Sequence, residues 1–369
     1  MNNREAFLSL VKAGLWGTDV EMGKYGTTDY EEIMRLAEEQ SVVGLVTAGL
    51  EHVQDTKLPK DMLLQFVGQT IQLEQQNLAM NQFIASTIEK MRRAGIYTLL
   101  VKGQGVAQCY ERPLWRNCGD VDLFLSDDNY EKAKKFLMPF TTSVENENVR
   151  EKHFGMTIDG LVVELHGRLY CGLSPRIEME LDKVYDETFY GGSVKSWECK
   201  GVQVFLLSPE NNAFYVFTHI LQHFYKEGVG LRQMCDWCRL LWAYKDSLDH
   251  GLLESKIRRA GLMSEWKSFG AFAVKLLGMP VEAMPFYSED SCWKRKAKRI
   301  CKFVMCVGNM GHNRDSSYFR EYPYLMRKII SAIRRIGDLM NHAMIFPLDT
   351  LRFAPHIVFN GVRSAIRGE

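Results

Sequence analysis

The apolar residues of this chain follow helical spacing up to residue 95, strand spacing from 96 to 207, and helical spacing again beyond. In the first region they recur every three or four positions, as in Met80, Ile84 and Ile88, which is typical of amphipathic helices. The last helix there is expected to end at Gly95, because basic residues precede it and glycine suits the position after a helix. A strand-forming block between two helical regions restricts the chain to mixed folds.

Two strand-like segments, each followed by a helix, open the central block. Ile96–Val101 is rich in β-branched and aromatic residues and stops at Lys102-Gly103-Gln104-Gly105, where a short helix is expected to begin. Gly119–Leu125 is the second strand, and Ser126-Asp127-Asp128 is an N-cap signal for a helix over Tyr130–Met138. The expected order is strand, helix, strand, helix.

A hairpin and a final strand complete the predicted sheet. Phe154–Ile158 and Leu161–His166 flank Asp159-Gly160, which is a turn signal for a β-hairpin. Val202–Leu207 is expected to close the sheet, and Ser208-Pro209 marks the start of the next helix. We therefore predict an α+β fold with a helical region at 1–95, a small mixed-sheet core at 96–207 and a helical region at 208–369.

The composition is that of an ordinary globular chain, with 46% hydrophobic and 25% charged residues. Its apolar runs are too short to cross a bilayer and its N-terminus lacks the apolar core of a secretory signal, so we expect no membrane partner. Nine cysteines are an odd number in a chain large enough to form its own core, which argues against a disulfide framework. These features together predict a cytoplasmic protein.

Charge is distributed unevenly along the chain. Residues 291–369 contain 15 Lys and Arg against 5 Asp and Glu, a balance of +10, although the whole chain carries only +1. A solvated helix face is the simpler interpretation of this basic region, and a surface for a nucleic-acid acceptor is the alternative. The candidate residues for such a surface are Trp293, Lys294, Arg295, Lys296, Lys298, Arg299, Tyr318, Phe319, Tyr322 and Tyr324.

Two carboxylates lie at the start of the second strand. Side chains two apart on a strand share a face, so Asp120 and Asp122 point the same way. If the hairpin pairs beside this strand, Glu164 becomes a third carboxylate on that face. Carboxylate oxygens suit Mg²⁺ or Mn²⁺, and three carboxylates can hold two such ions for phosphoryl transfer.

The turn before these carboxylates has the composition of an anion site. Gly103 and Gly105 let the backbone approach a phosphate at a helix N-terminus, and Lys102 and Arg116 add positive charge. These parts predict an enzyme that binds a nucleoside triphosphate as its metal complex and transfers the nucleotidyl group. The structural alternatives are a surface lysine at 102 and an arginine at 116 that tethers its loop.

The order of these motifs also resembles that of a known family. The residues in question are Leu99–Gly105, Tyr110, Pro113, Arg116, Gly119–Leu125, Glu164–His166, Leu207–Glu210, His219, His223, Leu231, Arg232 and Asp236. Over roughly residues 85–245 they resemble the uncharacterised bacterial nucleotidyltransferases of the DNA polymerase β-like superfamily. One difference is that Gly103 precedes Asp120 by 17 positions, a longer spacing than this superfamily usually has.

The resemblance implies a palm-like nucleotidyltransferase core that moves a nucleotidyl group from a triphosphate such as ATP to an acceptor hydroxyl, releasing pyrophosphate. It implies that the catalytic and metal-ligating residues are Asp120, Asp122 and Glu164, with two Mg²⁺ or Mn²⁺ ions. It implies that the nucleotide-binding residues are Lys102, Gly103, Gly105 and Arg116. His166 and Asp236 are accessory candidates. The acceptor stays open between a small molecule, a protein and RNA.

Three alternatives compete with this interpretation. A catalytically silent protein would only bind nucleotide, although retention of all three carboxylates argues against lost catalysis. A glycosyltransferase also uses Asp-x-Asp, but only one strand precedes Asp120 here, and several normally do. A zinc site is disfavoured because its candidate residues fall within amphipathic helices, where cysteine is usually a buried apolar residue. Those residues are His219, His223, Cys235 and Cys238.

Overall fold

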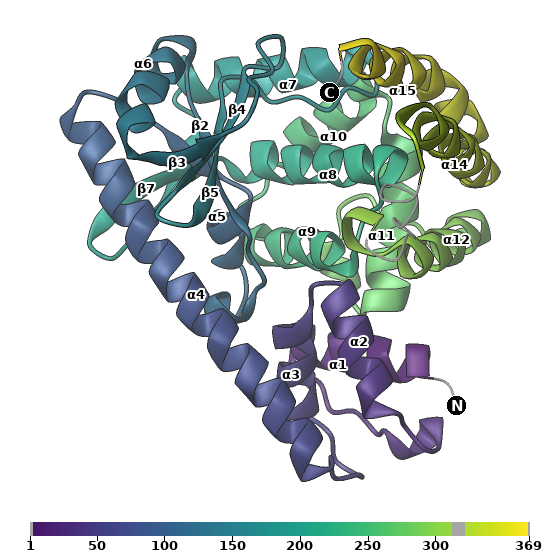
Figure 1. Cartoon of the computed structure of the whole chain (residues 1–369). Coiled ribbons are helices and arrows are strands. Elements are labelled where there is room, and N and C mark those ends of the chain that lie inside the picture. The colour runs from purple at the N-terminus through teal and green to yellow at the C-terminus, as the bar shows by residue number, and fades with distance from the viewer. Residues whose placement is uncertain (1–2, 312–321, 368–369) are drawn as a thin grey trace.

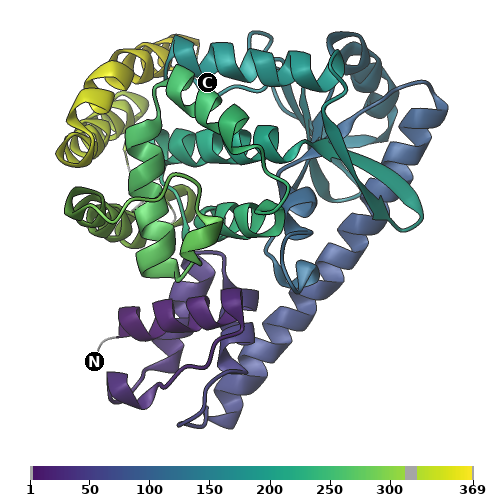
Figure 2. The same cartoon turned by 180° about the vertical axis from the view of Figure 1, so that it is seen from behind.

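The computed structural model describes residues 3–311 and 322–367. Figure 1 shows one mixed β-sheet with helices on both of its faces, a group of N-terminal helices away from the sheet, and one long helix that joins the two. The α+β fold predicted from the sequence is confirmed. Figure 2 shows the C-terminal helices on the side of the molecule opposite the long helix.

The sheet has seven strands in the order β3-β4-β5-β2-β1-β7-β6. Strand β2 is parallel to β5, and β1 is parallel to β7, while all other neighbours are antiparallel. The predicted hairpin is β4 and β5, and the predicted closing strand is β7. The bounds are β1 Leu99–Val101, β2 Asp120–Phe124, β3 Thr141–Val144, β4 His153–Ile158, β5 Leu161–His166, β6 Val194–Cys199 and β7 Val202–Leu207.

The N-terminal region is helical, as predicted. Its helices are α1 Asn3–Trp16, α2 Tyr30–Glu39, α3 Val43–Leu50 and α4 Lys60–Arg93. The first half of α4 lies beside α2 and α3, and its second half packs on the sheet (Figure 1). Gly95 follows α4 with a φ of 72°, which agrees with the predicted helix end.

Close contact between α1 and α3 depends on glycine. A Cβ atom added to Gly14 would lie 1.9 Å from the carbonyl oxygen of Leu45, and one added to Gly49 would lie 2.0 Å from that of Leu10. The two helix backbones therefore touch at these positions, and a side chain at either one would force the helices apart.

The remaining helices cover the sheet and extend to the C-terminus. They are α5 Gly103–Ala107, α6 Asp127–Leu137, α7 Pro175–Phe189, α8 Pro209–Lys226, α9 Leu231–Tyr244, α10 His250–Ala260, α11 Met263–Leu277, α12 Ser291–Val307, α14 Tyr324–Ile345 and α15 Pro347–Arg367. Short 3-10 turns occur at Gly23–Tyr25, Pro113–Trp115, Met138–Phe140, Val281–Ala283 and Asn309–Gly311. Within the described ranges, no helix has the length and apolar character needed to cross a membrane.

Alternation along the strands separates two apolar cores. Val121 and Leu123 face a core that includes residues of α4 and α6. Phe124 and Val101 face the opposite way, into a larger core shared with α8 and α9. Asp122 lies on the face of Phe124. The carboxylates of β2 are therefore on the side of the sheet that α8 and α9 cover.

Candidate active site

Three carboxylates meet where β2 lies beside β5. The parallel register places Asp122 opposite Glu164, and Asp120 precedes them on the same face. One carboxylate oxygen from each of the three residues lies within 4.8 Å of those from the other two. The predicted convergence of Asp120, Asp122 and Glu164 is confirmed, and the reason is the strand pairing inferred for the hairpin.

Lys102 neutralises part of this negative charge. Its Nζ lies 2.5 Å from Oδ1 of Asp122, whose side chain is 1% exposed. Burial lowers the pKa of Lys102, but Asp122 and the other acidic groups around it, among them Glu164 and Asp120, together more than offset this effect, so the net shift is upward. The charge of Asp122, followed by burial, raises the pKa of Asp120. The pocket therefore holds more negative charge than its lysine balances.

The backbone of Lys102 is unusual, and it positions the ammonium group. The residue has a φ of 54°, a backbone conformation that residues other than glycine adopt only at a cost in free energy. Gly103 follows with a φ of 34°, and a Cβ there would lie 3.2 Å from Sγ of Cys118. Gly105 instead allows α5 to pack on the sheet, since a Cβ there would lie 2.9 Å from a methyl group of Leu206.

Two histidines hydrogen-bond to Glu164. The Nε2 atoms of His153 and His166 lie 3.2 Å and 3.3 Å from its Oε2, and His166 Nε2 is also 2.9 Å from Oδ1 of Asp122. Burial would raise the pKa of Glu164, but these hydrogen bonds and the charge of Lys102 hold it well below its usual range. The side chain is therefore an ionised carboxylate. His166 thus lies against two of the three carboxylates, and the role of an accessory group stays a prediction.

Arg116 and Asp236 form a buried ion pair beside the carboxylates. Nε and Nη2 of Arg116 each lie 2.8 Å from a different oxygen of Asp236, and the hydroxyl of Tyr110 donates to the same carboxylate at 2.7 Å. The third guanidinium nitrogen donates to the carbonyl of Asn117. This pattern ties the 113–119 loop to α9, as in the structural alternative for Arg116. Nucleotide binding by Arg116 stays a prediction.

A pocket opens next to these groups, between β2, α5, α8 and α9, and we call it the carboxylate pocket. It is lined by Lys102, Gly103, Val106, Arg116, Asp120, Asp122, Val216, His219, Ile220, His223, Arg232, Gln233 and Asp236. Arg232, which adds a positive charge from α9, was not predicted from the sequence to be a site residue. Its one signal was the place of Leu231-Arg232 in the family resemblance.

His219 was also missed as a site residue. It lines the carboxylate pocket from α8, and its ring lies 4.4 Å from that of His223. Burial and the positive charge of Lys102 lower the pKa of His219. The ring is therefore neutral at ordinary pH, which makes it suited to accept a hydrogen bond.

Comparison with known proteins identifies the family. Residues 26–278 match the family described as uncharacterised nucleotidyltransferase. The chain belongs to this family. A solved structure titled an antigenic nucleotidyltransferase-like protein from Paracoccidioides brasiliensis is 14% identical to it, with a TM-score of 0.33, over 55% of this chain and 93% of that one. No curated protein matches the chain.

The structure of this nucleotidyltransferase family member does not support a zinc site formed by the two histidines of α8 and the two cysteines of α9. The groups that could hold a metal among the described residues are Asp120, Asp122 and Glu164, and His153, Glu164 and His166. The set of His219, His223, Cys235 and Cys238 is not among them. Both cysteines are fully buried, and burial raises their pKa, so they are neutral thiols. All nine cysteines are free, which agrees with the expected absence of a disulfide framework.

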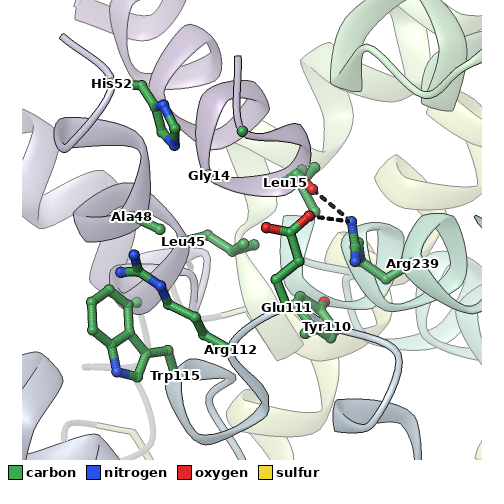
Figure 3. Close-up of a pocket in the computed structure, with 12 residues that line it drawn as sticks. Gly14, Leu15, Leu45, Ala48, His52, Tyr110, Glu111, Arg112, Trp115 and Arg239 are labelled. Carbon is green, nitrogen blue, oxygen red and sulfur yellow. Dashed lines mark hydrogen bonds and ion pairs between the residues drawn. The ribbon is translucent and has the colours of Figure 1, made fainter. Parts of the chain in front are cut away.

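A second pocket lies where α1 and α3 meet the segment that follows α5 (Figure 3). Figure 3 shows Arg239 directed at the backbone of Leu15 and at Glu111, and its Nη1 donates to the Leu15 carbonyl at 2.8 Å. Arg112, at the pocket's other side, pairs with Glu51. Both cations are thus already engaged, and no carboxylate cluster faces them among the lining residues. The carboxylate pocket remains the candidate active site of this nucleotidyltransferase family member.

The basic C-terminal region is partly described. On α12 the exposed cations Arg295, Lys298, Arg299 and Lys302 recur at helical spacing on one face. Tyr318 and Phe319 lie outside the described residues. Binding of a nucleic-acid acceptor there stays a prediction.

Proposed function

We propose that this chain is a metal-dependent nucleotidyltransferase that moves a nucleotidyl group from a nucleoside triphosphate to an acceptor hydroxyl and releases pyrophosphate. The observation that carries the proposal is the convergence of Asp120, Asp122 and Glu164 within 4.8 Å beside a pocket lined by Lys102 and Arg232. Membership of the family supports it. A place in the DNA polymerase β-like superfamily is part of the same proposal.

The residues present fit divalent cations. Three buried or half-buried carboxylates face Lys102 and Arg232, and the charge of Asp122 still raises the pKa of Asp120, so the group carries excess negative charge. Oxygen donors of this kind suit Mg²⁺ or Mn²⁺. In our proposal Asp120 and Asp122 would hold two ions and Glu164 would complete one of the two sites. Bound there, the ions would offset charge on the triphosphate and lower the pKa of an acceptor hydroxyl.

The chain's own residues then divide the remaining tasks. Lys102 and Arg232 would bind the β- and γ-phosphates, and Gly103 would let the backbone approach them. Arg116 and Asp236 act as positioning residues, since their ion pair holds the loop that leads into β2. His166 orients Asp122 and Glu164 by its hydrogen bonds to both.

The reaction balances without a redox partner. The acceptor oxygen forms a bond to the α-phosphorus, and the bond from that phosphorus to the oxygen bridging to the β-phosphate breaks. The electron pair of the broken bond leaves with pyrophosphate. The acceptor's proton passes to solvent. Lys102 lies beside Asp122, where it would stabilise charge on the departing pyrophosphate.

A transfer assay tests the proposal. Purified protein is incubated with each α-labelled nucleoside triphosphate, Mg²⁺ or Mn²⁺, and a cell extract as the source of acceptor. We expect label transfer and pyrophosphate release that fall at least about 100-fold in Asp122→Asn. Asp128→Asn, an exposed carboxylate of α6, is the matched control and should transfer like wild type. Equal transfer by Asp122→Asn and wild type would refute the proposal.

A further inference from the structure

The two histidines at Glu164 form a group with its own metal chemistry. His153 on β4 and His166 on β5 are opposite each other in the antiparallel register. Residues opposite each other share a face, and Glu164 lies two positions from His166 on that same face. Imidazole nitrogens from adjacent strands therefore converge on one carboxylate. No loop is involved in placing them.

The distances in this group suit a small tetrahedral ion. The two Nε2 atoms lie 3.2 Å and 3.3 Å from the same Oε2 of Glu164. With metal–ligand bonds of 2.0–2.1 Å, the edge of a tetrahedron is roughly 3.3 Å. Two of the three distances between the donor atoms thus have the length that such an ion needs, and all three donor atoms lie within 4.8 Å of one another.

The donor set distinguishes this group from the three carboxylates. Two imidazoles and one carboxylate favour Zn²⁺, Co²⁺ and similar ions, whereas oxygen-only sets favour Mg²⁺. The side chain of His153 is 31% exposed, so an ion can enter from solvent. Asp122 Oδ1 lies 2.9 Å from His166 Nε2 and is the oxygen of the neighbouring carboxylate set that lies beside this group.

We propose that His153, Glu164 and His166 form a second metal site, selective for zinc-like ions, that shares Glu164 with the carboxylates. An ion in this site takes the Glu164 oxygen away from the Mg²⁺ or Mn²⁺ set and so inhibits transfer. The inhibition rests on the proposed function, but the existence of the site does not.

Metal binding to the 369-residue chain tests the site without any nucleotide. After dialysis against a chelator, Co²⁺ is added as a spectroscopic probe, and Zn²⁺ is then titrated to displace it. We expect the intense visible absorption of tetrahedral Co²⁺, and a Zn²⁺ affinity at least about tenfold lower in His153→Ala. His250→Ala, an exposed histidine on α10, is the matched control and should bind like wild type.

Asp120→Asn separates the two metal sites. It removes a carboxylate of the Mg²⁺ set and leaves all three proposed zinc ligands, so Zn²⁺ binding should persist. The inference is overturned if His153→Ala binds as tightly as wild type. It is also overturned if Asp120→Asn loses as much affinity as His153→Ala, or if a cobalt–thiolate band places the ion at a cysteine.

Two further measurements address the folding of the variants and the inhibition of transfer by Zn²⁺. Circular dichroism of each variant shows whether it folds, and His153→Gln replaces His153→Ala if the latter does not. Zn²⁺ inhibition of label transfer is then compared between wild type and the folded variant. If no transfer is found at all, the proposed function fails while the cobalt and zinc titrations still decide the site.

Discussion

The buried ion pair between Arg116 and Asp236 should be a main contributor to the stability of the active-site loop. Arg116 is 4% exposed and Asp236 is 5% exposed, and three hydrogen bonds of 2.7–2.8 Å join them and Tyr110. Asp236→Asn keeps the shape of the side chain but leaves a buried guanidinium without a counter-charge. Breaking such a pair costs about 3–5 kcal/mol.

That loss is large enough to measure directly. With an unfolding entropy of about 2.1 cal/mol/K per residue, it corresponds to a melting midpoint lower by roughly 4–6 °C. Urea unfolding followed by circular dichroism would measure the free energy change. Arg116→Met should cost a similar amount, because it leaves Asp236 unpaired. The double variant should cost much less than the sum of the two.

A surface ion pair provides the control. Arg112 and Glu51 also form a two-bond pair, but their side chains are 45% and 46% exposed. Arg112→Met should therefore cost less than about 1 kcal/mol. A cost below about 1 kcal/mol for Asp236→Asn, or additive losses in the double variant, would refute the argument.

Three other perturbations follow from the structure. Lys102→Met should raise the Mn²⁺ affinity, measured by isothermal calorimetry, because it removes the cation that competes for Asp122. The same variant should slow transfer. Unchanged Mn²⁺ affinity would contradict the ion pair between Lys102 and Asp122. Burial, and then the charge of Asp349, raises the pKa of Glu265 to about 8, so the contribution of Glu265 to stability falls as pH rises from 4.5 to 8. Glu265→Gln should be the more stable protein above pH 8, by urea unfolding, with no difference below pH 4.5. Gly14→Ala should lower the free energy of unfolding by about 1–3 kcal/mol, because its Cβ would collide with α3. Gly68→Ala has open space around it and should raise the free energy of unfolding by up to about 1 kcal/mol. Equal shifts of the melting midpoint in the two variants would contradict the contact between α1 and α3.

Local signals in the sequence predicted much of the sheet. Strand β2, the β4–β5 hairpin and β7 have alternating or β-branched patterns and clear turn or cap residues at their ends. Strand β3, Thr141–Val144, was missed because it is short, polar and largely exposed at the sheet edge. Strand β6 was missed for a related reason, since its edge position leaves most of its residues partly exposed.

The site was predictable only where neighbours in sequence are neighbours in space. Alternation along β2 places Asp120 and Asp122 together, and one pairing assumption added Glu164. The partner of Arg116 is 120 residues away on α9, and no local pattern connects the two. The contact of His153 with Glu164 likewise depends on the cross-strand register, which the sequence alone does not determine.

Equilibrium binding tests whether the carboxylates bind a nucleoside triphosphate together with Mg²⁺, and it needs no acceptor. Binding of each α-labelled triphosphate is measured with and without Mg²⁺, in wild type, Asp122→Asn and the control Asp128→Asn. We expect wild type and Asp128→Asn to bind the triphosphate more tightly when Mg²⁺ is present. Mg²⁺ should not strengthen binding by Asp122→Asn. The proposed function would be contradicted if nucleotide affinity changed neither with Mg²⁺ nor in Asp122→Asn, or if wild type bound no nucleotide.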